Sequence, residues 1–294
     1  MEPLVSVICI TRNHERFCIE SLDSVLNQTY KNIEWIILDA ASTDNTVELI
    51  DNWLVENSVK AVFLKEKELK PVTVNLNKAL TYAHGEYVQF LSLDDALLND
   101  KIRNQVNLME KNKSLGMVFS DAVVVNEKSE VICNAYCGID DAKYESYTNT
   151  EFYKLFQDSP RIVAPTALYR KRVLDDLGRF DESITIEDWD MYLRIAKSLW
   201  EIKYQYQKHA VYRVVKGSLS RSTNIEFQIN ILKTYFKHKI NKKKITTSFF
   251  EKNRDRPLNE RFLLFKHTLR SKNKSWILYG LLHMLECKTR GIAK

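Results

Sequence analysis

Glycine is scarce in this chain, with only seven among 294 residues. A Rossmann dinucleotide site and a P-loop both need closely spaced glycines, because side chains would keep the backbone away from the phosphates. The first predicted strand, Val5–Thr11, runs instead into RNHERF, a stretch without glycine. The sequence therefore excludes a Rossmann dehydrogenase and a P-loop enzyme.

Cysteine and histidine are also sparse, and neither is arranged as a set of metal ligands. The five cysteines are scattered, and Cys133 and Cys137 lack the second pair that would complete a zinc site. The six histidines form no ligand pair at helical spacing. No serine stands in a nucleophile elbow. We expect a reduced protein without structural disulfides, and a chemistry that depends on carboxylates.

Long hydrophobic runs are missing as well. The longest apolar run near the C-terminus, residues 276–285, is shorter than the roughly 20 residues that span a bilayer. The chain opens with MEP and has no basic region typical of a signal peptide. These features predict a cytoplasmic protein.

The net charge of +6 is unevenly distributed. From Lys233 onward there are 17 Lys and Arg but only four Asp and Glu, so the preceding part is net acidic. A basic tail indicates an anionic partner, and we consider peripheral contact with the inner face of the cell membrane. The alternative is a solvated helical face. No nucleic-acid partner is expected.

The first hundred residues alternate between strand and helix patterns. Apolar runs predict strands at Val5–Thr11 and at residues 35–39, 61–64 and 87–91, with helical spacing between them. This order predicts an α/β fold, with a mostly parallel sheet flanked by helices. Two more strands are expected at residues 116–125 and 164–169, and a helical region follows Ser222.

Polar side chains stand where these strands end. Thr11 and Asp39 end two of them, and Asp94 and Asp95 follow a third. Ligands of such sheets bind at the carboxyl ends of the strands. Adjacent carboxylates repel unless a cation or hydrogen bonds offset their charges, so Asp94 and Asp95 indicate a divalent metal site. The alternative is a solvated turn that caps a helix.

A second carboxylate pair, Glu187 and Asp188, precedes a helix predicted from the spacing of Trp189, Leu193 and Ala196. Carboxylates are favourable at a helix N-terminus, so capping alone is one explanation. The other is that Asp188 acts as a general base.

Four segments together resemble the family 2 glycosyltransferases, which have the GT-A fold. They are VSVICITRNHERFCIESLDSVLNQTYKNIEWIILDAASTDNT, LNKALTYAHGEYVQFLSLDD, ALYRKRVLDDLGRFDESITIEDWDMYLRI and YRVVKGSLSRS. The resemblance covers about residues 3–223, and the segments occur in the order and spacing of the family.

The resemblance implies a role for each matching residue on the donor side. Thr11, Asn13 and Asp39 would bind the nucleotide. Asp94 would contact the ribose and, with Asp95, a Mn²⁺ or Mg²⁺ ion on the donor diphosphate.

Residues further along the chain match the family's acceptor and closing segments. The resemblance makes Asp188 the catalytic base, and it assigns Glu187 and Trp189 to positioning the acceptor. A core position is the alternative for Trp189. Lys216 and Arg221 would supply charge beside the diphosphate.

The sequence departs from the family pattern at three places. Ser92 replaces the first aspartate of the Asp-x-Asp motif, and Val215 stands where a histidine is frequent. Ala40 and Ala41 occupy positions that are usually glycine. Because of the first two departures, a glycosyltransferase-like binding module that has lost its metal site remains an alternative to an active enzyme.

The expected function is inverting transfer of a sugar, as by a hexosyltransferase, from a nucleoside diphosphate, UDP in particular, to a hydroxyl of a glycan or lipid-linked glycan. The context expected is bacterial surface polysaccharide synthesis, such as O-antigen, capsule or lipooligosaccharide. A sugar nucleotidyltransferase is the second candidate. We expect a catalytic domain at residues 1–223, with a nucleotide-sugar-binding half (1–100) and an acceptor half (101–223). A basic helical region at residues 224–294 would follow.

Overall fold

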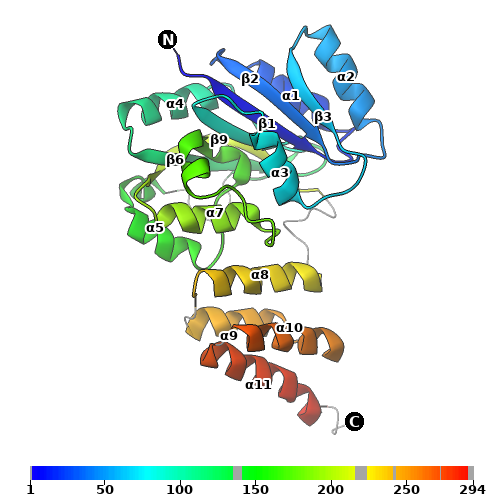
Figure 1. Ribbon diagram of the computed structural model, residues 1–294, viewed down its shortest axis with the longest axis vertical. Helices are drawn as coiled ribbons and strands as arrows, with labels where there is room; N and C mark the ends of the chain where they lie inside the picture. The colour runs from blue at the N-terminus through cyan, green and yellow to red at the C-terminus, as the bar shows by residue number, and fades with distance from the viewer. Residues whose placement is uncertain (1, 135–140, 216–223, 241–242, 272, 291–294) are drawn as a thin grey trace. The chain divides into compact units, whose positions relative to one another are not determined.

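The computed structural model describes residues 2–134, 141–215, 224–240, 243–271 and 273–290 (Figure 1). The chain divides into two compact units. Unit 1 contains Met1–Ser183 and Glu187–Ser218, and unit 2 contains Ile184–Ile186 and Leu219–Lys294.

Unit 1 opens with the predicted alternation of strands and helices. The elements are β1 (Val5–Thr11), α1 (Cys18–Leu26), β2 (Ile33–Asp39), α2 (Thr46–Glu56), β3 (Ala61–Lys65), α3 (Val72–Leu80) and β4 (Tyr87–Ser92). Strand β1 pairs in parallel with β2 and β4, and β2 pairs in parallel with β3. The predicted parallel arrangement is confirmed for these strands.

The rest of unit 1 extends the same sheet. Its elements are β5 (Ala96–Leu97), α4 (Lys101–Lys111), β6 (Leu115–Val125), β7 (Val131–Cys133), η1 (Ala142–Ser146), α5 (Asn149–Phe156), η2 (Ala164–Thr166), β8 (Leu168–Arg170), α6 (Lys171–Asp176), α7 (Glu187–Ala196) and β9 (Glu201–Arg213). The strand order is β3-β2-β1-β4-β8-β6-β9-β5, with β7 paired to β6. Strand β8 is antiparallel to both β4 and β6, while β9 is parallel to β6.

One predicted strand is shorter than expected. Residues 164–169 were expected to be extended, but Ala164–Thr166 forms a 3₁₀ turn and only Leu168–Arg170 pairs as β8. Pro165 is the physical reason, since it has no N–H to donate to a sheet ladder. The turn matters for function because Ala164 and Pro165 line the cavity described below.

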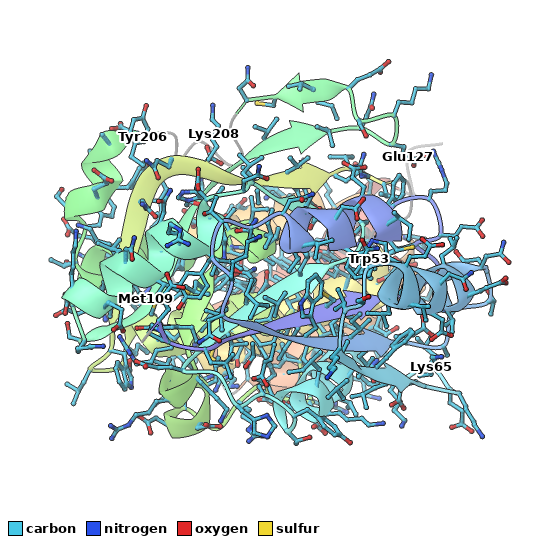
Figure 2. The ribbon with its side chains drawn as sticks, turned by 90° about the horizontal axis from the view of Figure 1, so that it is seen from above. Trp53, Lys65, Met109, Glu127, Tyr206 and Lys208 are labelled. Atoms are coloured by element: carbon cyan, nitrogen blue, oxygen red, sulfur yellow. The ribbon has the colours of Figure 1, made fainter. Side chains whose placement is uncertain are left out.

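Alternate side chains of the strands form two apolar layers. Helices α1, α2 and α4 bury apolar residues against one face of the sheet, where Val5, Val7 and Cys9 of β1 belong to the same core. Trp53 of α2 and Met109 of α4 are buried in this layer (Figure 2). Helix α3 contacts β1 and β2, and its Leu76 meets Ile10 and Phe90 of the strands in the cavity described below.

Unit 2 consists of helices around an aromatic core. Its elements are α8 (Ile225–Lys237), α9 (Lys243–Lys252), α10 (Leu258–Arg270) and α11 (Lys274–Arg290). Trp276 is fully buried, and its indole N–H donates to the Ile240 carbonyl at 3.0 Å. The Trp276 ring stacks on Tyr235 with 5.4 Å between centroids and contacts Phe249 edge-on. Aromatic packing of this kind holds the helices together.

None of the helices in the described ranges combines the length and the apolar character that crossing a bilayer requires.

Candidate active site

Three parallel strands end side by side at one edge of the sheet. Thr11 and Asp39, the last residues of β1 and β2, lie opposite each other in the strand register. Ile10 lies opposite Ser92, and the Leu93 N–H donates to the Ile10 carbonyl at 3.0 Å. The loops that follow these strands therefore meet at the edge where α/β sheets bind ligands.

The loops after β1 and β2 are bonded to each other. Asp39 is 1% exposed and accepts hydrogen bonds from the backbone N–H of Ser42, at 2.9 Å, and from its hydroxyl. Asn13 Oδ1 accepts the Thr43 N–H at 2.8 Å, and the Asn13 N–H donates to Ser42 Oγ at 2.9 Å. Asn13 has a φ of 56°, a left-handed conformation that asparagine tolerates. The loop is thus preformed, and the buried Thr11 Oγ1 has no hydrogen-bond partner in the described part of the chain.

Asp94 and Asp95 follow β4 in a tight turn, in which the Asp95 N–H donates to the Ser92 carbonyl at 2.9 Å. Asp95 is 5% exposed. Burial and, after it, the charge of Asp94 raise the pKa of Asp95 well above its usual range. Asp94 Oδ1 is buried and accepts no hydrogen bond from any described residue. The turn therefore carries negative charge that the described residues neutralise only in part.

Arg213, the last residue of β9, holds this carboxylate pair in place. Its backbone N–H donates to Asp95 Oδ1 at 2.8 Å, and its Nε donates to the Asp94 carbonyl at 3.0 Å. The guanidinium also donates to Ser129 Oγ and to Glu20 Oε2, each at 2.8 Å. Arg213 is 2% exposed. The buried guanidinium therefore links the turn after β4 to β9 and α1 through the exposed side chains of Ser129 and Glu20.

The carboxylate pair fits a hard divalent cation. Asp94 Oδ1 has no hydrogen-bond partner among the described residues, and the pKa of Asp95 is raised first by burial and then by the charge of Asp94. A bound cation would offset that charge. Among the described residues, no group of three or more His, Cys, Asp and Glu side chains is arranged to hold a metal. Mg²⁺ is commonly bound by one or two carboxylates, with substrate phosphates and water as its other ligands. Two carboxylates therefore suffice when a diphosphate is present.

Glu187 and Asp188 form the first turn of α7, on the opposite side of the same cavity. Burial and, after it, the charge of Asp188 raise the pKa of Glu187 to about 8. Burial also raises the pKa of Asp188 to about 6, although Asp188 Oδ1 accepts the Trp189 N–H at 2.6 Å. Burial therefore raises the pKa of both carboxyl groups towards neutrality, and Glu187 also lies beside the charge of Asp188, an arrangement that is common at sites of proton transfer.

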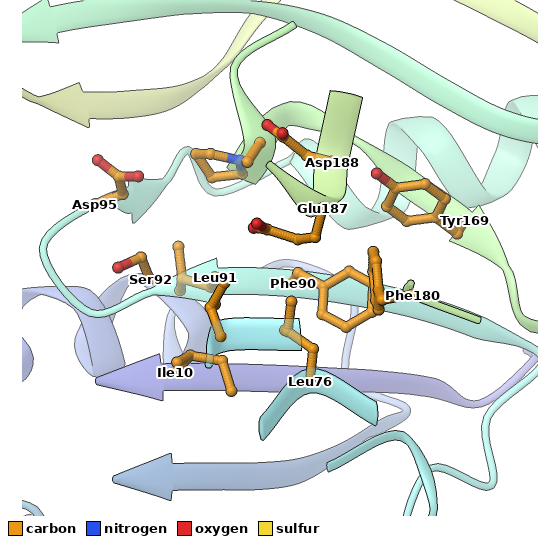
Figure 3. Close-up of a pocket in the computed structure, with 13 residues that line it drawn as sticks. Ile10, Leu76, Phe90, Leu91, Ser92, Asp95, Tyr169, Phe180, Glu187 and Asp188 are labelled. Atoms are coloured by element: carbon orange, nitrogen blue, oxygen red, sulfur yellow. The ribbon is translucent and has the colours of Figure 1, made fainter. Parts of the chain in front are cut away.

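The cavity between the two carboxylate pairs has a volume of about 180 Å³. Asp95, Glu187 and Asp188 contribute its charged lining, and Ser92 lies near Asp95 (Figure 3). The Glu187 carboxylate extends over Phe90 and Leu91 towards Ser92 (Figure 3). The structure thus brings Asp95, at the end of β4, and Glu187 and Asp188, at the start of α7, to a single cavity, while Asp94 is next to Asp95 in the turn and is not among the lining residues.

Other residues singled out from the sequence lie elsewhere. Trp189 is 2% exposed and donates its indole N–H to the Phe156 carbonyl at 2.6 Å, so it packs in the core and does not line the cavity. Lys216 and Arg221 lie outside the described residues. Cys9, Cys18 and Cys133 carry free thiols.

Sequence reasoning missed two residues of this edge. Arg213 ends a long strand whose pattern gave no sign of a buried charge; the only signal was its place in the YRVVKGSLSRS segment. The other is His14, whose pKa is lowered by burial while the charges of Asp94, Asp44 and Asp39 act in the opposite direction. The His14 backbone N–H donates to Thr46 Oγ1 at 2.9 Å, which joins the loop after β1 to the start of α2. Its buried Nδ1 has no partner among the described residues.

The fold and the paired carboxylates define a class, the glycosyltransferases with the GT-A fold. Residues 6–178, more than half of the chain, match the family model of glycosyl transferase family 2. The chain belongs to that family, which confirms the resemblance drawn from its motifs.

Curated relatives align over most of the chain. An uncharacterized glycosyltransferase of Methanocaldococcus jannaschii is 26% identical over 243 residues, 81% of either protein. The Escherichia coli UDP-Glc:alpha-D-GlcNAc-diphosphoundecaprenol beta-1,3-glucosyltransferase WfaP is 29% identical over 236 residues, which cover 79% of this chain and 86% of the relative.

Solved structures share the fold at low identity. The 1–349 fragment of Staphylococcus aureus TarS in complex with UDP-GlcNAc gives a TM-score of 0.63 at 16% identity, covering 98% of this chain and 92% of that one. The mannosyltransferase PcManGT of Pyrobaculum calidifontis, in complex with GDP-Man and Mn²⁺, gives 0.61 at 17% identity, covering 97% and 88%. The predicted GT-A fold is confirmed.

The raised pKa values of Glu187 and Asp188 predict how stability depends on pH. Both groups bind their protons more tightly in the folded state, so the stability they contribute is present at low pH. It is lost as the pH rises through about 6 and about 8. We expect the free energy of unfolding to fall between about pH 4 and pH 8, and Glu187→Gln to flatten this decline by roughly 1–3 kcal/mol.

Urea denaturation across this pH range measures the effect. Glu68→Gln, at an exposed site, is the matched control and should leave the wild-type slope unchanged. Parallel curves for the wild type and Glu187→Gln would show that burial does not hold the proton on Glu187.

Proposed function

We propose that this enzyme transfers a sugar from a nucleoside diphosphate sugar, with UDP as the expected nucleotide, to a hydroxyl group of a glycan or lipid-linked glycan. The observation that carries the proposal is the pair of carboxylate groups on one cavity. Asp95, next to Asp94, lines one side, and Glu187 and Asp188 line the other. A transferase of this type needs a charged anchor for the diphosphate and a base for the acceptor, with the reacting carbon between them.

On the donor side, Thr11, Asn13 and Asp39 would bind the nucleotide. The unpartnered Thr11 hydroxyl and the fixed loop around Asn13 support this assignment. Asp94 would contact the ribose, and Asp94 and Asp95 would hold a Mn²⁺ or Mg²⁺ ion. When bound, such an ion neutralises charge on the leaving diphosphate.

On the acceptor side, the second pair would share one proton near neutral pH, because burial and the repulsion between the two charges oppose ionisation of both groups. We assign the ionised form to Asp188, which would accept a proton, and the protonated form to Glu187. Asp188 then removes the proton of the acceptor hydroxyl as its oxygen bonds to the anomeric carbon. The bond from that carbon to the diphosphate breaks, and the electron pair leaves with the nucleoside diphosphate. Attack from the side opposite the leaving group inverts the anomeric centre.

The remaining predicted residues have supporting parts in the proposal. Protonated Glu187 would donate a hydrogen bond to the acceptor. Trp189 would position it indirectly, because its buried ring anchors the start of α7. Lys216 and Arg221 are proposed as diphosphate contacts on sequence grounds alone.

The nature of the acceptor is supported by a relative. WfaP acts on a diphosphoundecaprenol-linked sugar, as its name states. We extend that acceptor class, a lipid-linked glycan of bacterial surface polysaccharide synthesis, to this chain. We also propose that residues 1–100 serve mainly the donor, residues 101–223 the acceptor, and residues 224–294 the location of the enzyme. Family membership favours glycosyl transfer over the nucleotidyltransferase alternative.

The assignment of Asp188 as the base predicts a separation of binding and catalysis. Asp188→Asn should lower kcat about 10²–10⁴-fold, because proton removal is needed only during the reaction, while the affinity for the nucleotide stays near the wild-type value. For the wild type, kcat should rise with pH through about 6, the pKa of Asp188.

Release of nucleoside diphosphate, measured with Mn²⁺ and with EDTA, tests this prediction. Glu182→Gln is the control, since its side-chain oxygen can still accept the Asn77 amide. Near-wild-type turnover by Asp188→Asn, together with inactive Glu187→Gln, would transfer the role of base to Glu187. If the wild type and all of the variants bind the donor but none turns it over, the result would favour an inactive binding module.

We further propose that unit 2 contacts an anionic membrane through α10. Leu258, Phe262 and Leu269 lie along one side of this helix and are 60%, 55% and 48% exposed. Lys266 and Arg270 are exposed on the same helix. Apolar side chains beside basic ones suit the boundary between headgroups and acyl chains of an anionic leaflet.

This arrangement predicts charge-dependent binding to lipid. Each Lys or Arg near an anionic surface adds about 1 kcal/mol, so Lys266→Gln with Arg270→Gln should weaken binding roughly 30-fold. Phe262→Ser should weaken it too, while Leu199→Ser, at a fully exposed site of unit 1, should not. Sedimentation with anionic and neutral vesicles provides the measurement, and equal binding of all variants would exclude this surface.

A further inference from the structure

The lining of the cavity away from its carboxylates is apolar. Ile10 of β1, Phe90 of β4, Val72 and Leu76 of α3, and Phe180 form this part, which we call the apolar floor (Figure 3). Phe180 and Leu76 are each 5% exposed, while Ile10, Val72 and Phe90 are half-buried beside the open space.

The floor is held in place by specific contacts. The Phe180 N–H donates to Asn77 Oδ1 at 3.0 Å, and Asn77 Nδ2 donates to the Phe180 carbonyl at 2.9 Å, so the loop is fixed to α3 from both sides. The Phe180 ring meets Phe90 edge-on, with 5.3 Å between centroids, and Phe90 meets Tyr169 at 5.7 Å. A preformed surface of this kind is a binding element, because a ligand need not order it.

The chemistry of the floor limits which group can rest on it. Its five side chains offer no hydrogen-bond donor or acceptor. A sugar hydroxyl placed there would give up its hydrogen bonds to water without replacement, which is unfavourable. A methyl group placed there would lose only apolar contact with water, which is favourable.

The two carboxylate pairs fix which part of a donor faces the floor. In the proposed function, on which this step rests, the anomeric carbon lies between Asp95 and Asp188, since one side anchors the leaving group and the other the acceptor. The rest of the sugar ring then extends over the floor. A cavity of about 180 Å³ is smaller than the roughly 300–1,000 Å³ typical of whole-ligand pockets, so it accommodates part of the donor and not the nucleotide.

We propose that the apolar floor selects a donor sugar that carries a methyl group, either in an acetamido substituent or at C6 of a 6-deoxy sugar. The two sources share one chemistry, a methyl group on an otherwise polar ring. The floor gives this enzyme its preference against the fully hydroxylated parent sugar.

Three donors that share the gluco configuration and differ at C2 or at C6 provide the test. UDP-glucose, UDP-N-acetylglucosamine and UDP-6-deoxyglucose share nucleotide and ring, and their Kd values are measured by titration calorimetry with Mn²⁺. We expect one of the methyl-bearing donors to bind about 10-fold or more tightly than UDP-glucose, the range for one apolar group in a fitted pocket. The better of the two identifies the source of the methyl group.

Two floor variants link the preference to these residues. Val72→Thr keeps the shape and adds a hydroxyl, and Leu76→Asn makes the floor polar; both should shift the ratio towards UDP-glucose. Val55→Thr, a 79% exposed position on α2, is the control and should keep the wild-type ratio. Thermal melting verifies the fold, and Val72→Thr decides the outcome if Leu76→Asn is destabilised.

The outcomes separate this inference from the proposed function. UDP-glucose binding as tightly as both methyl-bearing donors, or an unchanged ratio in Val72→Thr, overturns the inference and leaves sugar transfer in place. A lower affinity of the variants for a lipid-linked acceptor, with unchanged donor ratios, would assign the floor to the acceptor and also overturns it. Failure of all three donors to bind overturns the proposed UDP-sugar function, and the inference with it.

Discussion

The hydrogen bonds between Arg213 and the Asp94–Asp95 turn connect two strands of the sheet that do not pair with each other. Arg213 closes β9 and the turn follows β4, and these strands are separated in the sheet by β8 and β6. Burying a guanidinium is costly unless its donors are satisfied, and here Glu20, Ser129 and the turn accept from it. Loss of the Arg213 side chain would remove the donor to the Asp94 carbonyl and the partner of Glu20, while the backbone N–H that donates to Asp95 would remain. The position of the carboxylates thus depends on a residue far away in the sequence.

The hydrogen bonds of Arg213 hold Asp94 and Asp95 in a buried environment where ionised carboxylates are unfavourable unless a ligand is bound. Asp95 is buried beside another carboxylate, Asp94 retains an oxygen without a partner among the described residues, and Glu187 and Asp188 both have raised pKa values. Such groups reduce stability and are retained at functional sites, where a ligand offsets their cost. A cation with a diphosphate beside Asp94 and Asp95, and an acceptor hydroxyl beside Glu187 and Asp188, would each offset part of this cost in stability. The apolar floor lines the same cavity, and in our proposal it sets which sugar is preferred.

Most of the sheet could be predicted from the sequence, because its buried strands are continuous apolar runs and its helices have clear periodicity. The sequence also placed Thr11, Asp39 and Asp94–Asp95 at one edge of the sheet, since parallel strands bring their carboxyl ends together; their roles at the site stay predictions. The 3₁₀ turn at Ala164–Thr166 was missed because a proline within an apolar run was read as part of a strand. The roles of Arg213 and of the apolar floor could not be predicted, because they depend on contacts between residues that are far apart in the sequence. In the sequence, Ile10 and Phe90 cannot be distinguished from core residues. Only the fold shows that they line a cavity together with Leu76 and Phe180.

The central claim is that Asp94 and Asp95, held by Arg213, form the end of the site that binds the metal and the diphosphate. Crystals grown with UDP and Mn²⁺, with data collected at the manganese absorption edge, test it directly. The expected result is an anomalous peak about 2.0–2.6 Å from a carboxylate oxygen of Asp94 or Asp95, with the UDP diphosphate as its other ligand. A manganese ion and a diphosphate bound elsewhere, with both carboxylates contacting protein alone, would contradict the claim.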